Sequence, residues 1–203
     1  MAPLFSAEHV RRELFRYVDD VAAREQVQKI MFGIDPLLNA EYPYNYLLAH
    51  DYLDNSLLSY VVDLAPSVDL LKNCRRGHRS DIKTALRDPQ FERFTVDQDQ
   101  PSYPLHEEYR ELHRKDAGRV TRSKASFDSQ YKKLTEGNAV LFGLRYQGTA
   151  IAYAYYEMFG DKAIYASAAS DPDMTHLPLY HLLMWSAMEY FQTKGVRYIE
   201  VGQ

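Results

Sequence analysis

The first pattern along the chain is a series of apolar positions at helical spacing. Val10, Leu14 and Val18 lie four residues apart and predict a helix over 6–23. The patterns that follow predict a strand over 27–34, a short helix over 44–53 and a second strand over 57–64, which ends before Ala65-Pro66. Together these elements make up an incomplete α/β unit.

The pattern restarts after Pro66 and continues to the end of the chain. It predicts one or two helices over 68–87, single helices over 105–115, 127–135 and 178–193, and strands over 91–96, 139–146, 149–159, 162–169 and 196–203. Tight-turn signals at Gln147-Gly148 and Gly160-Asp161 join three of these strands into an antiparallel meander. The sequence thus predicts an α/β (α+β) fold: a mixed sheet in which the meander is followed by a buried helix and a returning parallel strand.

The third strand of the meander loses its large side chains half-way along. After Tyr165 it reads Ala166-Ser167-Ala168-Ala169-Ser170, in a chain that has 17 tyrosines and 9 phenylalanines. Small residues in a strand mark a place where another backbone or a ligand approaches closely. We therefore expect this stretch to be accessible. On the middle strand, alternation places Tyr153 and Tyr155 on one face and Tyr156 on the other.

The last strand should lie parallel to the third meander strand. Alternation along it predicts one face with Val196, Tyr198 and Glu200 and a second face with Arg197, Ile199 and Val201.

Composition is that of an ordinary globular protein whose charge is unevenly distributed. The 203 residues carry a net charge of -4, yet segments 75–87 and 110–124 are each +4, so the remainder sums to -12. Segregation of this kind suggests an anionic partner, although solvated helix faces give the same count. Cys74 is alone, which excludes a disulfide framework. No apolar run approaches the roughly 20 residues of a membrane span, so we expect a cytoplasmic protein without a transmembrane segment.

Common catalytic motifs do not occur. The segment HEEYRELH, 106–113, fails the zinc-helix spacing because the fourth residue after His106 is Arg110, so no metal site is expected. His176 and His181 are five residues apart and would point away from each other. No Walker loop, dinucleotide glycine fingerprint or nucleophile elbow is present, which removes common ATPase, dehydrogenase and hydrolase classes.

Several short motifs in order resemble the FemAB family of peptidoglycan aminoacyltransferases and its acetyltransferase-like relatives. They are RRGHRSDIKTA (75–85), LHRKDAGRVTR (112–122), IYASAASDPD (164–173), LPLYHLLMWSAM (177–188) and YIEVGQ (198–203). The family carries two GNAT-like halves in tandem. The resemblance implies that 1–65 is the end of a first half and 66–203 a second half, truncated at its C-terminus. A fragment that ends there should expose sheet edge and tend to self-associate.

The resemblance also implies where the substrates bind. In the GNAT fold the third meander strand and the returning strand separate, and the acyl donor lies in the gap, which would leave 166–169 partly unpaired. The loop SDPDMTHLP has no glycine, and its Asp171 and Asp173 would repel the pyrophosphate of CoA. This argues against the usual mode of CoA binding in this half, and the better-known members of the family take the acyl group from aminoacyl-tRNA. The expected donor is either aminoacyl-tRNA or acyl-CoA, with no cofactor held permanently.

The candidate site residues follow from this interpretation. Tyr153 and Tyr165 would orient the amine or the carbonyl group, and Glu200 and His181 are the candidate general bases. Substrate-binding candidates are Arg76, Arg79, Lys83, Arg119, Arg122 and Ser167.

The leading hypothesis is acyl or aminoacyl transfer to an amine of a cell-envelope precursor or surface sugar. The acceptor would be a phosphorylated or anionic small molecule or a lipid-linked molecule, and tRNA is a candidate partner. Two alternatives remain: a CoA-dependent GNAT acetyltransferase with its CoA site in the first half, and a non-catalytic module that binds an anionic glycan or nucleic acid.

Overall fold

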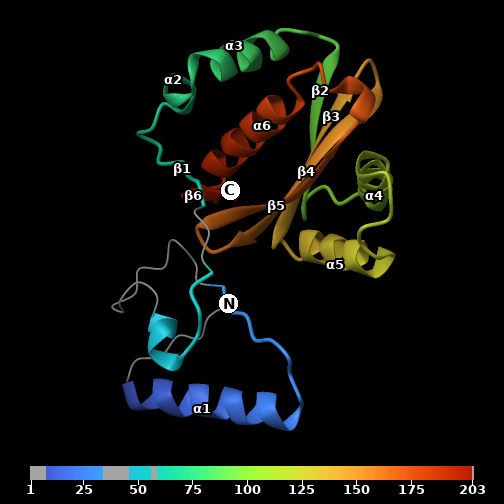
Figure 1. The fold of residues 1–203 in the computed structure, drawn as a ribbon. Coiled ribbons are helices and arrows are strands. Elements are labelled where there is room, and N and C mark those ends of the chain that lie inside the picture. Colours follow the sequence, from blue (N-terminus) through green and yellow to red (C-terminus); the bar gives the residue numbers. More distant parts are fainter. Residues whose placement is uncertain (1–7, 34–45, 56–58, 203) are drawn as a thin grey trace. The chain divides into compact units, whose positions relative to one another are not determined.

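The computed structural model describes residues 8–33, 46–55 and 59–202 of the chain (Figure 1). The chain divides into two compact units, Met1–Leu58 and Ser59–Gln203. This division comes earlier than the predicted boundary at residue 65, because the short strand at 61–63 belongs to the sheet of the second unit. The assignment of the two units to halves of a tandem GNAT protein stays a prediction.

The first unit is built on one helix and a small aromatic cluster. Helix α1 spans Glu8–Arg24 and the 3-10 helix η1 spans Tyr46–His50. The ring of Phe15 lies 5.7 Å from Phe32 and stacks on His50 at 4.2 Å. The predicted strand over 27–34 is wrong, since its described residues 27–33 are irregular. A strand needs a neighbour for its backbone groups, and the described part of this unit contains none.

The second unit contains a six-stranded sheet whose order is β1-β6-β5-β4-β3-β2. The strands are β1 (Val61–Asp63), β2 (Phe91–Val96), β3 (Ala139–Tyr146), β4 (Thr149–Phe159), β5 (Lys162–Ser170) and β6 (Tyr198–Glu200). Strands β5 and β6 are parallel and every other neighbouring pair is antiparallel. The mixed sheet, the meander and the parallel return strand are thereby confirmed.

Helices cover both faces of this sheet (Figure 1). The helical elements are α2 (Leu70–Asn73), α3 (Arg76–Ala85), α4 (Tyr103–Ala117), α5 (Lys124–Thr135), η2 (Pro172–Met174) and α6 (Leu179–Thr193). Apolar side chains of α3 and α6 pack on one face, and those of α4 and α5 pack on the other. The predicted alternation on β4 is confirmed, because Tyr153 and Tyr155 lie on the α4/α5 face and Tyr156 on the α3/α6 face.

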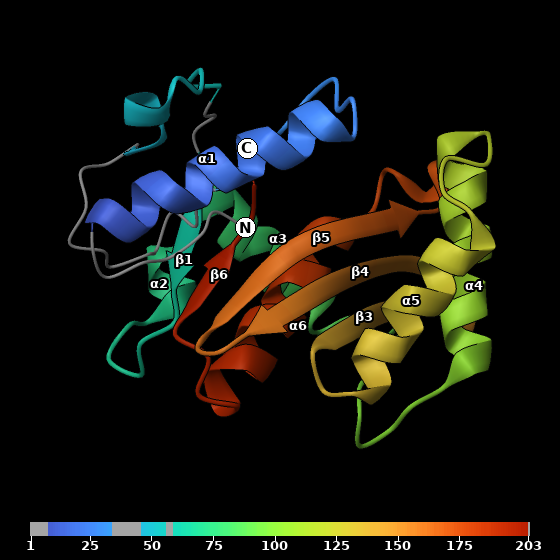
Figure 2. The same cartoon turned by 90° about the horizontal axis from the view of Figure 1, so that it is seen from below.

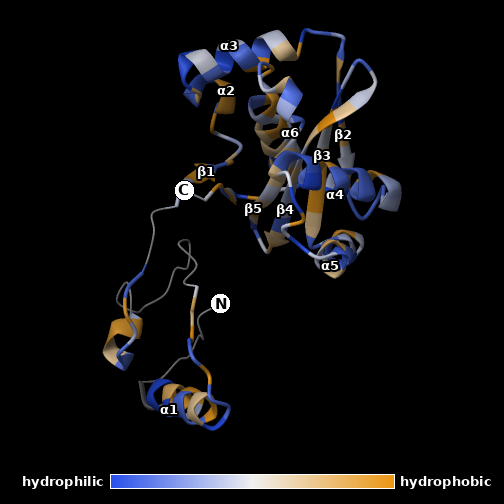
Figure 3. Ribbon diagram, turned by 45° about the vertical axis from the view of Figure 1, so that its right-hand side comes forward, coloured by the Kyte–Doolittle hydropathy of each residue, from blue (hydrophilic) through white to orange (hydrophobic). Residues whose placement is uncertain are grey.

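Local sequence explains where α4 begins and ends. Ser102 caps α4 by accepting a hydrogen bond from the Leu105 amide, and Gly118 ends it at a φ of 66°. Figure 3 shows α4 with a largely hydrophilic outer surface, as expected for a helix that buries a single stripe. Helix α6 buries seven side chains, and the expectation of a buried helix is confirmed.

Strands β5 and β6 begin side by side and then separate (Figure 2). Their pairing runs from Lys162–Tyr198 to Ile164–Glu200 and covers three residue pairs. One detail of the prediction is wrong: Val196 packs in the same cluster as Ile199 and Val201. The amides of Arg197 and Tyr198 both donate to the Asp161 carbonyl, so regular alternation begins only after Val196.

Candidate functional site

A β-bulge lies next to the point where β5 and β6 separate. Tyr155 pairs with Ser167 and Tyr156 with Tyr165, so Ala166 is an extra residue in β5. Bulges redirect backbone groups and are frequent beside active sites. The pairing with β6 ends two residues earlier, at Ile164. The bare stretch of β5 therefore has one edge on β4 and another that β6 does not cover.

Backbone direction shows which amides face the uncovered edge. The Asp171 amide donates to Ile151 of β4 at 2.7 Å, whereas the Ser170 amide donates to Asp116 of α4 at 2.9 Å. Successive amides of an antiparallel strand point to opposite edges. The amide of Ala168, two residues before Ser170, accordingly points away from β4 and into the gap.

Side chains of α4 and α6 hold the end of β5 on both sides. The hydroxyl groups of Tyr109 and Ser167 are hydrogen-bonded at 2.5 Å, and both residues are buried. On the other side of the strand end, the Tyr180 hydroxyl donates to the Ser170 hydroxyl at 3.1 Å. Side chains of α4 and α6 thus contact β5 along the part that β6 does not pair with.

The tyrosines around this edge remain protonated at neutral pH. Burial, together with the smaller effects of the neighbouring Tyr180, Tyr109 and Asp116, raises the pKa of Tyr165 to about 12. Burial also raises the pKa of Tyr109, partly offset by its hydrogen bond to Ser167. These phenols can donate hydrogen bonds to a carbonyl or an oxyanion, but they are poor proton acceptors.

The two candidate bases lie in different places. Glu200 sits on β6 where the strands separate, and its carboxylate accepts a hydrogen bond from the Ser59 hydroxyl at 2.7 Å. His181 lies at the contact of α6 with α3: its Nδ1 is 3.5 Å from an Asp81 oxygen, and its ring is 4.4 Å from that of His78. Only Glu200 is on a strand that borders the gap.

The aspartates of the loop after β5 are paired with a lysine. Lys115 Nζ is 2.7 Å from Asp171 and 3.3 Å from Asp173. This contact is the main reason why the pKa of the Asp171 carboxyl is lowered. The phosphate-repelling charge expected from the sequence is therefore partly compensated by α4.

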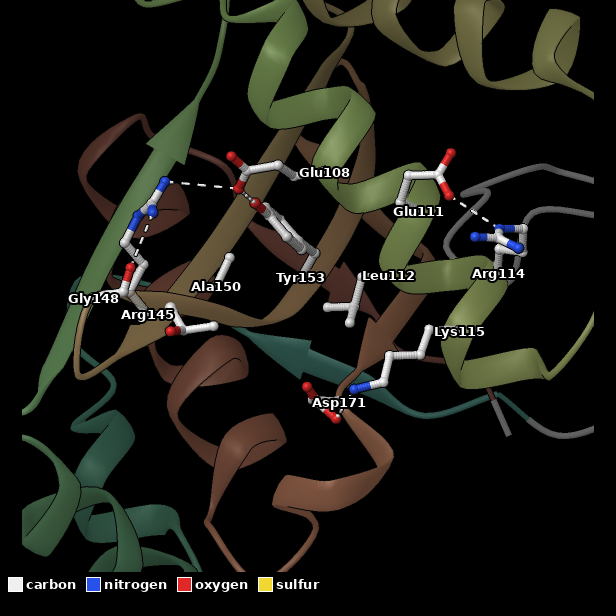
Figure 4. A pocket seen from close by; sticks show the side chains of 11 residues that line it. Glu108, Glu111, Leu112, Arg114, Lys115, Arg145, Gly148, Ala150, Tyr153 and Asp171 are labelled. Atoms are coloured by element: carbon white, nitrogen blue, oxygen red, sulfur yellow. Dashed lines mark hydrogen bonds and ion pairs between the residues drawn. The ribbon is translucent and has the colours of Figure 1, made fainter.

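A groove of about 600 Å³ lies between α4 and the β3–β4 hairpin (Figure 4). Its lining mixes acidic, basic and apolar side chains, among them Glu108, Glu111, Leu112, Lys115, Arg145 and Tyr153. The Tyr153 hydroxyl donates to Glu108 at 2.9 Å. Because Tyr153 pairs with Ala169 of β5, the groove adjoins the bare stretch on the α4 side.

The cationic residues predicted to bind the substrates are dispersed. Arg76 and Lys83 are exposed, and neither forms an ion pair with any residue that the structure describes. Arg79 is half-buried and donates to the Cys74 carbonyl at 3.2 Å. Arg119 and Arg122 are exposed in the connection that follows α4. The positive charge of Arg122 acts on Tyr109, where it opposes the rise in the pKa that burial causes.

The structure brings together three of the predicted residues and separates the others. Tyr165, Ser167 and Glu200 border the gap, while Tyr153 lines the groove and packs on the opposite face from Tyr165. A joint action of Tyr153 and Tyr165 on one group is therefore not what the geometry supports.

Sequence reasoning missed Tyr109, Asp116 and Tyr180. The spacing of Tyr109 and Asp116, two turns of α4 apart, was the available signal that both face the sheet. Within the described ranges, no group of three or more His, Cys, Asp or Glu residues is placed to hold a metal ion. No helix in those ranges is both long and apolar enough to cross a membrane.

A family model described as the acetyltransferase (GNAT) domain matches residues 72–203. The chain belongs to this family. Its fold is similar to that of FemX, with a TM-score of 0.57 and 14% identity over 71% of this chain and 52% of FemX. The C-terminal domain of a lysylphosphatidylglycerol synthetase from Agrobacterium fabrum gives a TM-score of 0.55 and 17% identity over 71% of this chain and 46% of that one.

L-PGS from Bacillus licheniformis matches with a TM-score of 0.54 and 14% identity over 71% of this chain and 46% of that one. Identities this low show a shared fold alone. The GNAT chain spans about half the length of these solved structures. No curated protein matches it significantly. The FemAB-like GNAT fold is thereby confirmed, and acyl transfer in the broad sense is the chemistry of the family.

Proposed function

We propose that this GNAT protein is a FemAB-like N-acyltransferase whose reaction takes place where β5 and β6 separate. The observation that carries the proposal is the bulge at Ala166 directly after the last β5–β6 pair at Ile164. An extended donor can lie along the uncovered edge of β5, with its carbonyl near the redirected amides. The small side chains from Ala166 to Ser170 leave room for it.

The step is nucleophilic acyl transfer. An acceptor amine forms a bond to the carbonyl carbon of the donor, and the bond from that carbon to the leaving oxygen or sulfur breaks. An acceptor that binds as an ammonium ion first gives up one proton to become the neutral nucleophile; its nitrogen loses a second proton as the amide forms, and the leaving group ends with one. Backbone amides at the bulge and the Ala168 amide would stabilise the oxyanion, a contribution that reaches about 3 kcal/mol per donor in other enzymes. Asp116 and Glu200 are carboxylates at the two borders of the gap that could receive the proton.

We infer an aminoacyl-tRNA donor and a cell-envelope acceptor, as the family resemblance implies. The free cations Arg76 and Lys83 on α3 favour a phosphate-rich donor, because phosphates are bound by clusters of unpaired Arg and Lys. The loop after β5 offers no glycine-rich pyrophosphate cradle. Use of acetyl-CoA as the donor, and binding of nucleic acid without turnover, are the two competing outcomes of the experiment.

The experiment is a size series at Ala168, measured on the full-length protein with charged tRNA and, separately, with acetyl-CoA. Ala168→Ser keeps the side chain small and should retain transfer within about twofold. Ala168→Val adds two methyl groups beside the uncovered edge, on the face that packs against the α3/α6 cluster, and should lower transfer more than tenfold, because a blocked near-attack geometry is costly. Fluorescence of Trp185, the single tryptophan and part of the α6 core, verifies folding of both variants.

Normal transfer by folded Ala168→Val would refute the location. Stabilisation and turnover with acetyl-CoA would replace the aminoacyl donor, and salt-dependent tRNA binding without any turnover would favour the binding module.

A further inference from the structure

We propose that the groove between α4 and the β3–β4 hairpin binds an alkylammonium group of the acceptor, with Glu108 as its counter-ion. The inference rests on the proposed function, in which the acceptor is an amine. It adds the place where that amine is held and the chemistry that selects it.

Charge pairing singles out one carboxylate among those that line the groove. Asp171 is already bound by Lys115 at 2.7 Å. Glu111 is bound by Arg114 at 3.0 Å and by Arg110 at 2.5 Å. Both oxygens of Glu111 are therefore engaged. A ligand that displaced the cation from Asp171 or from Glu111 would leave that cation without its partner.

Glu108 is less fully compensated. It accepts one hydrogen bond from the Tyr153 hydroxyl at 2.9 Å, and its nearest cation, Arg145, is 3.7 Å away. An ionised carboxylate has about four lone-pair sites, so Glu108 retains capacity for further donors. Its side chain is 47% exposed, which leaves it open to a ligand in the groove (Figure 4).

The tyrosine fixes the direction of this carboxylate. Tyr153 is fully buried, and burial together with Glu108 raises the pKa of its hydroxyl, which stays a donor. Arg145 is held in turn by the Gly148 carbonyl at 3.3 Å and by the Phe94 ring at 5.2 Å. Glu108 is thus oriented by the buried hydroxyl of Tyr153. Its neighbouring cation, Arg145, has other interaction partners.

The rest of the groove suits a short alkyl arm. Leu112 and Ala150 contribute apolar surface beside the Tyr153 ring. An ammonium group carries three donors on a compact charge, which matches a single oriented carboxylate better than the planar fork of a guanidinium. The groove also lies one strand from the uncovered edge of β5, because Tyr153 and Ala169 are paired and neighbouring strands are about 4.8 Å apart.

The test is an amide NMR titration of the chain with Nα-acetyl-L-lysine methylamide. The matched ligand is Nα-acetyl-L-norleucine methylamide, which has the same arm without the ammonium group. We expect shifts confined to residues 108–115 and 145–153 with the lysine probe, at a dissociation constant in the millimolar range, and none with norleucine. Glu108→Gln should weaken binding about tenfold, the value of one charge-assisted contact, and Tyr153→Phe should weaken it less.

Glu189→Gln is the matched control variant. Glu189 is also a half-exposed glutamate, 43% against 47%, and is also ion-paired, with Arg93 at 2.6 Å, but it lies on α6 across the sheet. Its replacement should leave binding within about twofold. Equal binding of both probes, or unchanged affinity in Glu108→Gln, would overturn the proposal.

Failure of this inference can be told apart from failure of the proposed function. If the full-length protein transfers an acyl group and Glu108→Gln does not change the KM for the amine, the groove is not the ammonium site, but the proposed function stands. If the lysine probe binds in a way that depends on Glu108 but no amine is acylated, the groove is an ammonium site and the proposed function is refuted.

Discussion

We expect the hydrogen bond between Tyr109 and Ser167 to be one of the main contacts that hold the edge of β5 in place. Both residues are buried, at 0% and 9% exposure, and their hydroxyl groups are 2.5 Å apart. Tyr109→Phe leaves the Ser167 hydroxyl without this partner in a site that is largely closed to water. A buried hydroxyl without a partner costs about 1–3 kcal/mol.

The reverse variant should have a similar cost. Ser167→Ala leaves the buried Tyr109 hydroxyl without its Ser167 partner and should also cost about 1–3 kcal/mol. In the double variant both polar groups are gone, and the total cost should stay close to that of Tyr109→Phe alone. The cycle should therefore give a coupling energy of about 1–3 kcal/mol.

A second tyrosine–serine pair on the same strand is the control. The Tyr180 hydroxyl donates to Ser170 at 3.1 Å, but Tyr180 is 47% exposed. Water can replace its hydroxyl, so Tyr180→Phe should cost about 0.5 kcal/mol or less. Urea unfolding followed by Trp185 fluorescence measures all variants. Additive effects in the Tyr109–Ser167 cycle, or equal costs of the two Tyr→Phe changes, would refute the reasoning.

Three further predictions concern other parts of the second unit. Burial lowers the pKa of His106 to about 4. Between that pH and about 6.5 the unfolded chain binds more protons at this residue than the folded protein does. The free energy of unfolding should therefore fall as the pH drops through this window, by up to about 3 kcal/mol. Urea midpoints at pH 7 and 4.5 should show this loss reduced in His106→Leu and unchanged in the exposed control His176→Leu. Gly143→Ala should destabilise the protein by about 1–3 kcal/mol, because the added Cβ would overlap the Phe94 ring. Gly77→Ala, in helix α3 with open space around it, should stabilise the protein by about 0.5–1 kcal/mol. Shifts of the melting temperature with the same sign in both variants would contradict this. Arg76→Gln with Lys83→Gln should weaken tRNA binding about tenfold per residue in fluorescence anisotropy, while Lys132→Gln on α5, already near Glu136, should have little effect; equal losses would exclude α3 as the contact surface.

The elements of the second unit could be predicted because their patterns agree with the forces that form them. Strands 139–146 and 149–159 occur with the predicted bounds, since alternation and the Gln147-Gly148 turn specify the same register. The first unit was harder. The apolar run at 27–34 reads as a strand, but a strand is a property of a pair, and sequence pattern gives no information on whether a neighbour is present.

The candidate site shows the same division between local and non-local causes. The small side chains of 166–170 are visible in the sequence, and they correctly indicated an edge that β6 does not pair with. The expected accessibility of the stretch is wrong for Ser167, Ala169 and Ser170, which are buried. What completes that edge comes from elsewhere in the chain: Asp116 binds the Ser170 amide from 54 residues away, and Tyr109 reaches Ser167 across 58. Neither contact leaves a periodicity of its own, because Tyr109 and Asp116 occupy ordinary inward positions of a helix. Tyr153 and Tyr165 were both expected to orient the amine or the carbonyl group. Both are tyrosines of adjoining strands, but the extra residue at Ala166 changes the alternation along β5, and this bulge also turns the backbone toward the gap. The feature that defeats a face assignment from sequence is thus the one on which the proposed chemistry depends.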